Sequence, residues 1–263
     1  MLLVLKLTLV PALVLSVSLA ARRWGPKVAG VLTGLPIVSA PALFFFAVEQ
    51  GTAFASEASR AVLMSLFGVA ASGVTYAWVA RRTPWWLALP ISWSAFFVMI
   101  VLAQRVRWGA TVALLGAFAA IATGHALLPR ATAKKPAAGP AWDLPLRCVA
   151  AMTLVLSVTA LAERLGPTLS GALTPFPVAI SILLGFSHAQ QGADAAITFM
   201  RGFMPGMWSF AVFCWVLAVG IVPLGTALGF ALATATALAI QATVLWGTQR
   251  VARGPEVRRA GGS

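Results

Sequence analysis

Long apolar stretches separated by short polar connections make up almost the whole chain. The apolar stretches cover residues 2–20, 28–48, 59–80, 85–104, 109–128, 146–162, 169–187, 197–219 and 222–247, the last two separated by a turn at Gly220–Pro223. A helix needs about 20 apolar residues to cross a bilayer core of about 30 Å, so the pattern predicts about nine transmembrane helices. The longest connection that is too polar to cross runs only from Pro129 to Leu146. We therefore expect an all-α, polytopic integral membrane protein without a substantial soluble domain.

Composition agrees with this pattern and excludes several classes of function. Of the 263 residues, 60% are hydrophobic and 10% are charged, which an ordinary soluble domain does not show. Cys148 and Cys214 both lie in apolar stretches without metal-ligand spacing, so we expect free thiols and no metal site. The sequence contains no phosphate-binding loop, H-E-x-x-H, C-x-x-C or G-x-S-x-G motif. We therefore expect no enzyme activity and no cofactor.

The formal net charge of +13 comes from basic residues that lie mainly in the short connections. In a membrane protein such residues indicate topology, so no nucleic-acid partner is expected. Fourteen of the 19 Lys and Arg residues fall on one side of the predicted arrangement and five on the other. This bias predicts a multi-pass protein of the bacterial inner (plasma) membrane, with its N-terminus outside and its C-terminus in the cytoplasm. The lipid bilayer is the expected partner, and a homodimer is left open.

The second half of the chain repeats the first at an offset of 141 residues. Residues 13–60 and 154–201 are identical at 19 of 48 positions without a gap. The identities include Gly25-Pro26 with Gly166-Pro167, Thr33-x-x-Pro36 with Thr174-x-x-Pro177, and Arg60 with Arg201. General apolar similarity does not place prolines, glycines and an arginine in register, so the pattern indicates an internal duplication.

The offset spans five predicted helices, an odd number, so the two copies should enter the membrane from opposite sides. This interpretation divides the chain into a first four-helix repeat (1–105), a connector helix with a cytoplasmic loop (106–143), a second four-helix repeat (144–250) and a basic C-terminal tail (251–263). Inverted repeats of this kind are typical of secondary transporters, because the two units can exchange conformations and open a central site to each side in turn.

The matching stretches 28–48 and 169–187 carry clustered prolines and glycines, so both helices should be kinked or broken, around Pro36–Pro41 and Pro175–Ser181. Interrupted backbone inside a membrane must face protein or a water-filled cavity, and a matching pair of broken helices indicates a transport site. We expect the two breaks to face each other across a polar cavity. The alternative is that glycine and proline only permit close helix packing. The candidate substrate-binding residues are Thr33, Pro36, Ser39, Thr174, Pro177 and Ser181.

All six acidic residues lie near predicted helix ends or in connections, which argues against proton antiport through a central carboxylate. Arg60 and Arg201 are matching residues of the two repeats, and each has a carboxylate nearby in the sequence, Glu49 for the first and Asp194 for the second. One interpretation is that these four residues gate the site or attract an anion. The other is that the arginines only extend to the membrane interface.

The segment Ser170-Gly171-Ala172-Leu173-Thr174-Pro175-Phe176-Pro177, followed by an apolar stretch and Arg201, resembles the small GlpM-type membrane proteins of bacteria. Those proteins are four-helix chains of about the length of one repeat. The resemblance covers helices six to eight and, more weakly, one to three. It implies a fused, inverted pair of four-helix units and names no substrate.

Three functions are compatible with the sequence. The leading hypothesis is a secondary transporter or exporter of a small polar or anionic solute that works by alternating access. A flippase for lipids or lipid-linked glycans is the second, because charge is nearly absent from the predicted helix centres. A membrane assembly factor that transports nothing is the third.

Overall fold

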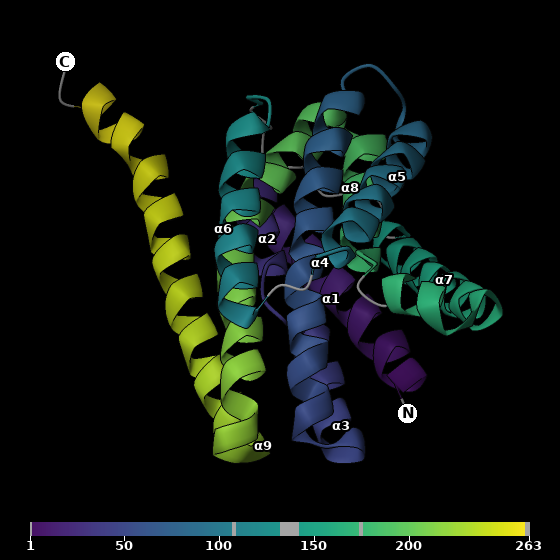
Figure 1. The fold of residues 1–263 in the computed structure, drawn as a ribbon. Coiled ribbons are helices and arrows are strands. Elements are labelled where there is room, and N and C mark those ends of the chain that lie inside the picture. The colour runs from purple at the N-terminus through teal and green to yellow at the C-terminus, as the bar shows by residue number, and fades with distance from the viewer. Residues whose placement is uncertain (1, 107–108, 132–141, 174–175, 261–263) are drawn as a thin grey trace.

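The computed structural model describes residues 2–106, 109–131, 142–173 and 176–260. These ranges contain helices and no strand, as the sequence predicts, because a backbone surrounded by lipid has to satisfy its hydrogen bonds within each segment. The helices are α1 (Leu2–Trp24), α2 (Pro26–Thr33), α3 (Ser39–Gln50), α4 (Thr52–Val79), α5 (Trp85–Gln104), α6 (Ala110–Leu127), α7 (Asp143–Leu173), α8 (Val178–Gln191) and α9 (Ala193–Ala260) (Figure 1).

Within the residues that the structure describes, five stretches of helix are long and apolar enough to cross a membrane. They are Leu7–Trp24, Thr52–Val79, Trp85–Ala103, Ala110–Leu127 and Ala193–Gly247, in α1, α4, α5, α6 and α9. Side chains such as Leu115 and Leu228, which are 62% and 64% exposed, leave apolar surface on the outside of the bundle. These features are compatible with a membrane protein.

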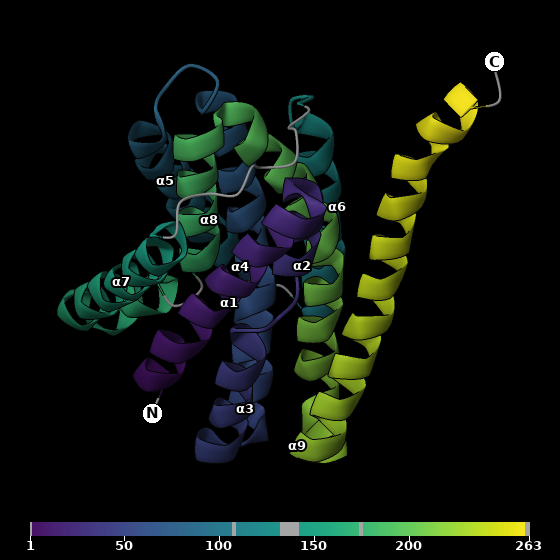
Figure 2. The same ribbon diagram turned by 180° about the vertical axis from the view of Figure 1, so that it is seen from behind.

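Helix α9 consists of two arms that run side by side in opposite directions (Figures 1 and 2). They meet at Gly225, whose φ of 76° and ψ of 171° are not helical. The turn expected at Gly220–Pro223 therefore lies slightly later, and the helix continues through those residues. A reversal with positive φ favours glycine because it has no Cβ. We call residues 193–224 the first arm and residues 226–260 the second arm.

The apolar stretch expected at 28–48 is divided into α2 and α3 by residues 34–38. Pro36 supplies no N–H and disfavours helical geometry in the residue before it, so α2 ends at Thr33. Pro41 lies in the first turn of α3, where a missing N–H costs nothing. On the second matching stretch, Pro177 precedes the first residue of α8.

Two tight turns have the same backbone geometry. Gly51 separates α3 from α4 with φ 89° and ψ 166°, and Gly192 separates α8 from α9 with φ 83° and ψ 175°. Positive φ at both positions explains why glycine is found at each. The two glycines are 141 residues apart, the offset of the sequence repeat.

Helix α2 crosses the first arm of α9 at very short range, and four glycines form the contact: Gly30 on α2, Gly34 directly after its last residue, and Gly202 and Gly206 on α9. A Cβ added at Gly34 would lie 2.3 Å from the carbonyl carbon of Gly206, and one added at Gly202 would lie 1.9 Å from the carbonyl oxygen of Lys27. Small residues four apart on both helices allow the two backbones to touch, as in other membrane helix pairs. At these positions the glycines therefore permit close helix packing, which was the alternative interpretation of the sequence.

Candidate functional site

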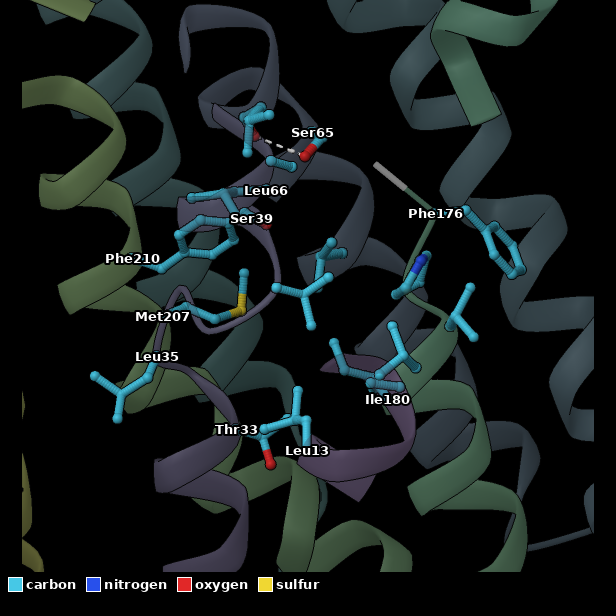
Figure 3. A pocket seen from close by; sticks show the side chains of 18 of the residues that line it. Leu13, Thr33, Leu35, Ser39, Ser65, Leu66, Phe176, Ile180, Met207 and Phe210 are labelled. Carbon is cyan, nitrogen blue, oxygen red and sulfur yellow. Dashed lines mark hydrogen bonds between the residues drawn. The ribbon is translucent and has the colours of Figure 1, made fainter. Parts of the chain in front are cut away.

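A cavity of about 210 Å³ lies where the break after α2 meets the start of α8 (Figure 3). Its wall also includes parts of α1, α3, α4, α7 and the first arm of α9. The lining residues are Val10, Leu13, Thr33, Leu35, Val38, Ser39, Ala42, Leu43, Phe46, Val62, Ser65, Leu66, Val69, Val155, Phe176, Pro177, Val178, Ala179, Ile180, Phe203, Met207 and Phe210. Both interrupted segments therefore contribute to one cavity.

The first residues of two helices line this cavity. Val38 and Ser39 are the N-cap and first residue of α3, and Pro177 and Val178 hold the same positions in α8. The first backbone N–H groups of a helix have no partner within the helix, and they carry partial positive charge. The Ala40 N–H already donates to the Pro36 carbonyl, and the Val178 N–H donates to the Phe176 carbonyl, both at 2.8 Å. The two helix ends therefore act on an electronegative group through their partial positive charge and through the N–H groups that remain.

Three hydroxyl groups reach the cavity wall, and they differ in whether they already donate a hydrogen bond within the protein. The Thr33 hydroxyl donates to the Ala29 carbonyl at 2.8 Å, and its oxygen points away from the centre of the cavity in Figure 3. The Ser65 hydroxyl donates to the Val62 carbonyl at 2.6 Å. The Ser39 hydroxyl has no hydrogen-bond partner among the residues that the structure describes. Ser39 is therefore the hydroxyl best placed to donate to a solute.

The rest of the wall is apolar, so the expectation of a polar cavity was wrong for its side-chain lining. Valine, leucine, isoleucine and phenylalanine dominate, and none of the lining residues is charged. What polarity the cavity has comes from the ends of α3 and α8 and from Ser39. Such a site suits a small solute with an apolar body and one polar group.

Ser181 and Pro36 belong to the framework of the site and do not line the cavity. The Ser181 hydroxyl accepts a hydrogen bond from the Trp93 indole N–H at 2.9 Å and donates to the Pro177 carbonyl at 2.9 Å. Phe176 packs against Trp93 with a ring-centroid distance of 5.3 Å. These contacts attach the start of α8 to α5. The Pro36 carbonyl accepts from the Ala40 N–H at 2.8 Å, and Thr174 lies outside the described residues.

A cluster of charged and polar side chains joins three helices near one end of the bundle; Asp143 and Arg147 are buried, Arg22 is half-buried and Gln190 is exposed. We call Ser18, Arg22, Asp143, Arg147 and Gln190 the charged corner. The Asp143 carboxylate accepts from Arg22 at 2.6 Å, from Arg147 at 3.0 Å and from the Gln190 amide. Arg147 also donates to Gln190 at 2.9 Å and to Ser18 at 3.4 Å. The cluster thus links the end of α1, the start of α7 and the end of α8.

Burial and hydrogen bonding act against each other on the Asp143 carboxyl, which is 1% exposed. Burial by itself raises the pKa, but the hydrogen bonds from Gln190, Arg147 and Arg22 outweigh it and hold the pKa below its usual range. The carboxylate is therefore charged at neutral pH, and Arg147 is its closest buried counter-ion.

The four residues expected to gate the site have different neighbours in the structure. Arg60 donates to Glu57 of its own helix at 2.5 and 3.0 Å. Arg201 donates to the Leu128 carbonyl at the end of α6 at 3.0 Å, and no ion pair joins it to Asp194. Glu49 is exposed near the end of α3 and forms no ion pair with the described residues.

Sequence reasoning missed the charged corner and Gln241. Gln241 is 3% exposed in the second arm of α9, donates to the Val31 carbonyl at 2.5 Å and accepts from the Ser209 hydroxyl at 2.7 Å. It was the only amide side chain in the apolar stretch 222–247, which was the available signal. The spacing of Asp143 and Arg147, four residues apart at the start of a helix, was the signal for the corner.

Comparisons of the chain with protein-family models, with curated proteins and with solved structures gave no match. The case for a function therefore depends on the residues of this chain and their arrangement.

Proposed function

We propose that the protein is a secondary transporter of a small solute with an apolar body and one polar, preferably anionic, group. The observation that carries the proposal is the cavity shared by the two interrupted segments, with the first residues of α3 and α8 in its wall. Interrupted helices whose N-terminal ends approach an anionic group are a recurrent feature of transporter sites.

The size of the cavity favours a small solute over a lipid. Its volume of 210 Å³ is below the roughly 300–1,000 Å³ typical of sites for drug-sized ligands. A lipid with two acyl chains does not fit such a space, so flippase activity is the weaker of the two transport hypotheses. Phe46, Phe203 and Phe210 provide apolar contact area for the body of a small organic anion.

An inverted repeat with about nine membrane crossings is part of the proposal. In its support, α3 and α8 end at Gln50 and Gln191, and α4 and α9 begin at Thr52 and Ala193, each pair 141 residues apart. The glycine turns between them are also at matching positions. On the basis of the segment Ser170–Pro177 and Arg201 in the sequence, we also propose a distant relationship to GlpM-type chains.

We place the protein in a bacterial inner membrane with its N-terminus outside. The basic residues support this orientation, because Arg81 and Arg82 follow α4 and Arg130 follows α6, at ends of helices that lie on one side of the bundle in Figure 1. The charged corner, which includes the end of α1, then lies towards the cytoplasm.

Flux measurements in proteoliposomes test the proposal. We expect uptake of one or more radiolabelled monocarboxylates from a panel of short-chain, branched and aromatic acids, and slower uptake of the matching neutral amides. Substitution of Ala42, which lines the cavity, by Phe should fill the space and reduce flux at least about tenfold. Ala122→Phe on the exposed face of α6 is the matched control and should leave flux unchanged. Absence of flux across acids, sugars and amino acids, with folded and inserted protein, would contradict transport.

A further inference from the structure

The charged corner lies beyond the cavity on each of the three helices that it joins. The cavity wall includes Leu13 of α1, Val155 of α7 and Ile180 of α8. From these residues the chain reaches Ser18, Arg147 and Gln190 after about 7.5, 12 and 15 Å of helix respectively, at 1.5 Å per residue. All three helices therefore extend past the cavity and are fastened to one another at the same end.

The chemistry of the corner suits a contact that opens and closes. Two charged groups and an amide that separate towards water regain hydration, which offsets much of the attraction that they lose. Asp143 is the shared acceptor, so separation of α8 or α1 breaks only the bonds that cross to that helix. The Arg147–Asp143 pair lies within α7 and is retained, which keeps the charge of Asp143 compensated.

The matching position on α3 does not repeat this contact among the described residues. Glu49, which is Gln190's match at the 141-residue offset, is exposed and forms no ion pair with them. The described part of α3 therefore does not repeat the contact that Gln190 makes from α8.

We propose that the charged corner is the cytoplasmic gate of the cavity, closed in this structure. The inference rests on the proposed transport function and adds the residues that control access. Asp143 is the central acceptor, Gln190 is the contact from α8, and Arg22 is the contact from α1. Opening separates α8 and α1 from the start of α7 and exposes the cavity to the cytoplasm.

Accessibility of a cysteine in the cavity tests the gate without any knowledge of the solute. The reporter is Ala42→Cys, in a background in which Cys148 and Cys214, both free thiols, are replaced by Ala. A small, charged methanethiosulfonate reagent that does not cross membranes is added to inside-out vesicles, where it reaches the cytoplasmic face, or to intact cells. In the reporter protein we expect faster labelling from the outer face.

Two gate variants and one control complete the experiment. Gln190→Ala removes the contact from α8, leaves no buried charge unpaired, and should increase the labelling rate from the cytoplasmic face at least about fivefold. Asp143→Asn should increase it further. Gln191→Ala, an exposed neighbour on the same helix without a hydrogen-bond partner among the described residues, should have no effect.

Each outcome of the labelling experiment either supports or overturns the proposed gate. An unchanged cytoplasmic rate in folded Gln190→Ala protein overturns the gate even if Asp143→Asn does not fold. Equal labelling of the reporter protein from both faces also overturns it, because the gate would then not be closed. Because labelling needs no solute, a gate that behaves as expected in a protein without measurable flux refutes the proposed function alone.

Discussion

Two contacts hold helices of this protein together in opposite ways. At the crossing of α2 and α9, four glycines bring the backbones into direct contact, and a Cβ at Gly206 would lie 2.5 Å from the Val31 carbonyl oxygen. At the charged corner, side chains bridge α1, α7 and α8 through Asp143. Backbones in van der Waals contact gain nothing by separating in a membrane, whereas charged groups that separate regain water.

The difference suggests which parts of the protein move. We expect α2 and the first arm of α9 to behave as one rigid unit, and α1 and α8 to change position relative to the start of α7.

The largest expected effect comes from filling the glycine crossing. Gly206→Ala places a methyl group against backbone atoms of α2 that cannot move aside, so the folded protein should be lost or destabilised by at least about 1–3 kcal/mol. The measurement is the yield of monodisperse protein and its Tm in detergent. Gly247→Ala, where nothing lies within 4 Å, is the control and should be neutral or slightly stabilising. Similar behaviour of the two variants would contradict close packing at the crossing.

A smaller loss of stability is expected at the polar contact beside the crossing. Gln241→Leu leaves the Val31 carbonyl without its side-chain donor and removes one of the two acceptors of the Ser209 hydroxyl, the other being the Gly206 carbonyl at 2.8 Å. Hydrogen bonds between membrane helices contribute about 0.6–2 kcal/mol each, so Tm should fall by a few degrees while flux is retained. The double variant with Ser209→Ala should lose little more, because both act on one network. Strictly additive losses would mean that the two side chains are independent.

Removal of the different cavity hydroxyls should reduce flux to different extents, depending on whether each hydroxyl already forms a hydrogen bond. Ser39→Ala removes the hydroxyl that has no partner, so flux should fall about fivefold, the equivalent of one hydrogen bond of about 1 kcal/mol. Thr33→Val should have a smaller effect, because the Thr33 hydroxyl already donates to Ala29. Ser94→Ala on α5, whose exposed hydroxyl donates to Pro90, is the control. A larger effect at Thr33 than at Ser39 would contradict this assignment of the binding hydroxyl.

The smallest expected effect is that of pH on the charged corner. The lowered pKa of Asp143 means that its contribution to stability is present above the ordinary carboxyl pKa and is lost only as the pH falls through the lower, folded value. The difference in Tm between the wild type and Asp143→Asn should therefore be constant between pH 8 and pH 5. A difference that shrinks towards pH 5 would show that the hydrogen bonds do not outweigh burial.

The sequence predicted the all-helical class, because a strongly apolar chain has to satisfy its backbone hydrogen bonds within each segment, but it did not predict that α7 continues through residues 163–168. The bounds of α5 agree with the predicted stretch 85–104, and the break around Pro36 follows from the missing N–H of proline. The turn in α9 was misplaced because the stretch around Gly220–Pro223 offers several glycines and a proline, and the sequence does not reveal which one adopts positive φ.

The candidate site was harder to predict, because its polarity depends on distances between segments far apart in the chain. Ser39 and Ser181 look alike in the sequence, yet Ser181 is bonded to Trp93 of α5 and Ser39 has no such partner. The glycines of α2 looked like helix breakers, and their role became clear only with the position of Gly202 and Gly206. Asp143 lies 121 residues from Arg22, a separation over which no spacing rule operates.

Pulsed electron spin resonance distances in lipid bilayers test the central claim, that the cavity opens by movement at the charged corner around a rigid crossing. One spin-label pair, at the exposed residues Trp24 and Gln191, spans the corner, and a second, at Lys27 and Asp194, reports on α2 against α9. The account predicts two populated distances for the Trp24–Gln191 pair and a single narrow distance for the Lys27–Asp194 pair. A single narrow distance for both pairs, or a broad distribution confined to Lys27–Asp194, would contradict it.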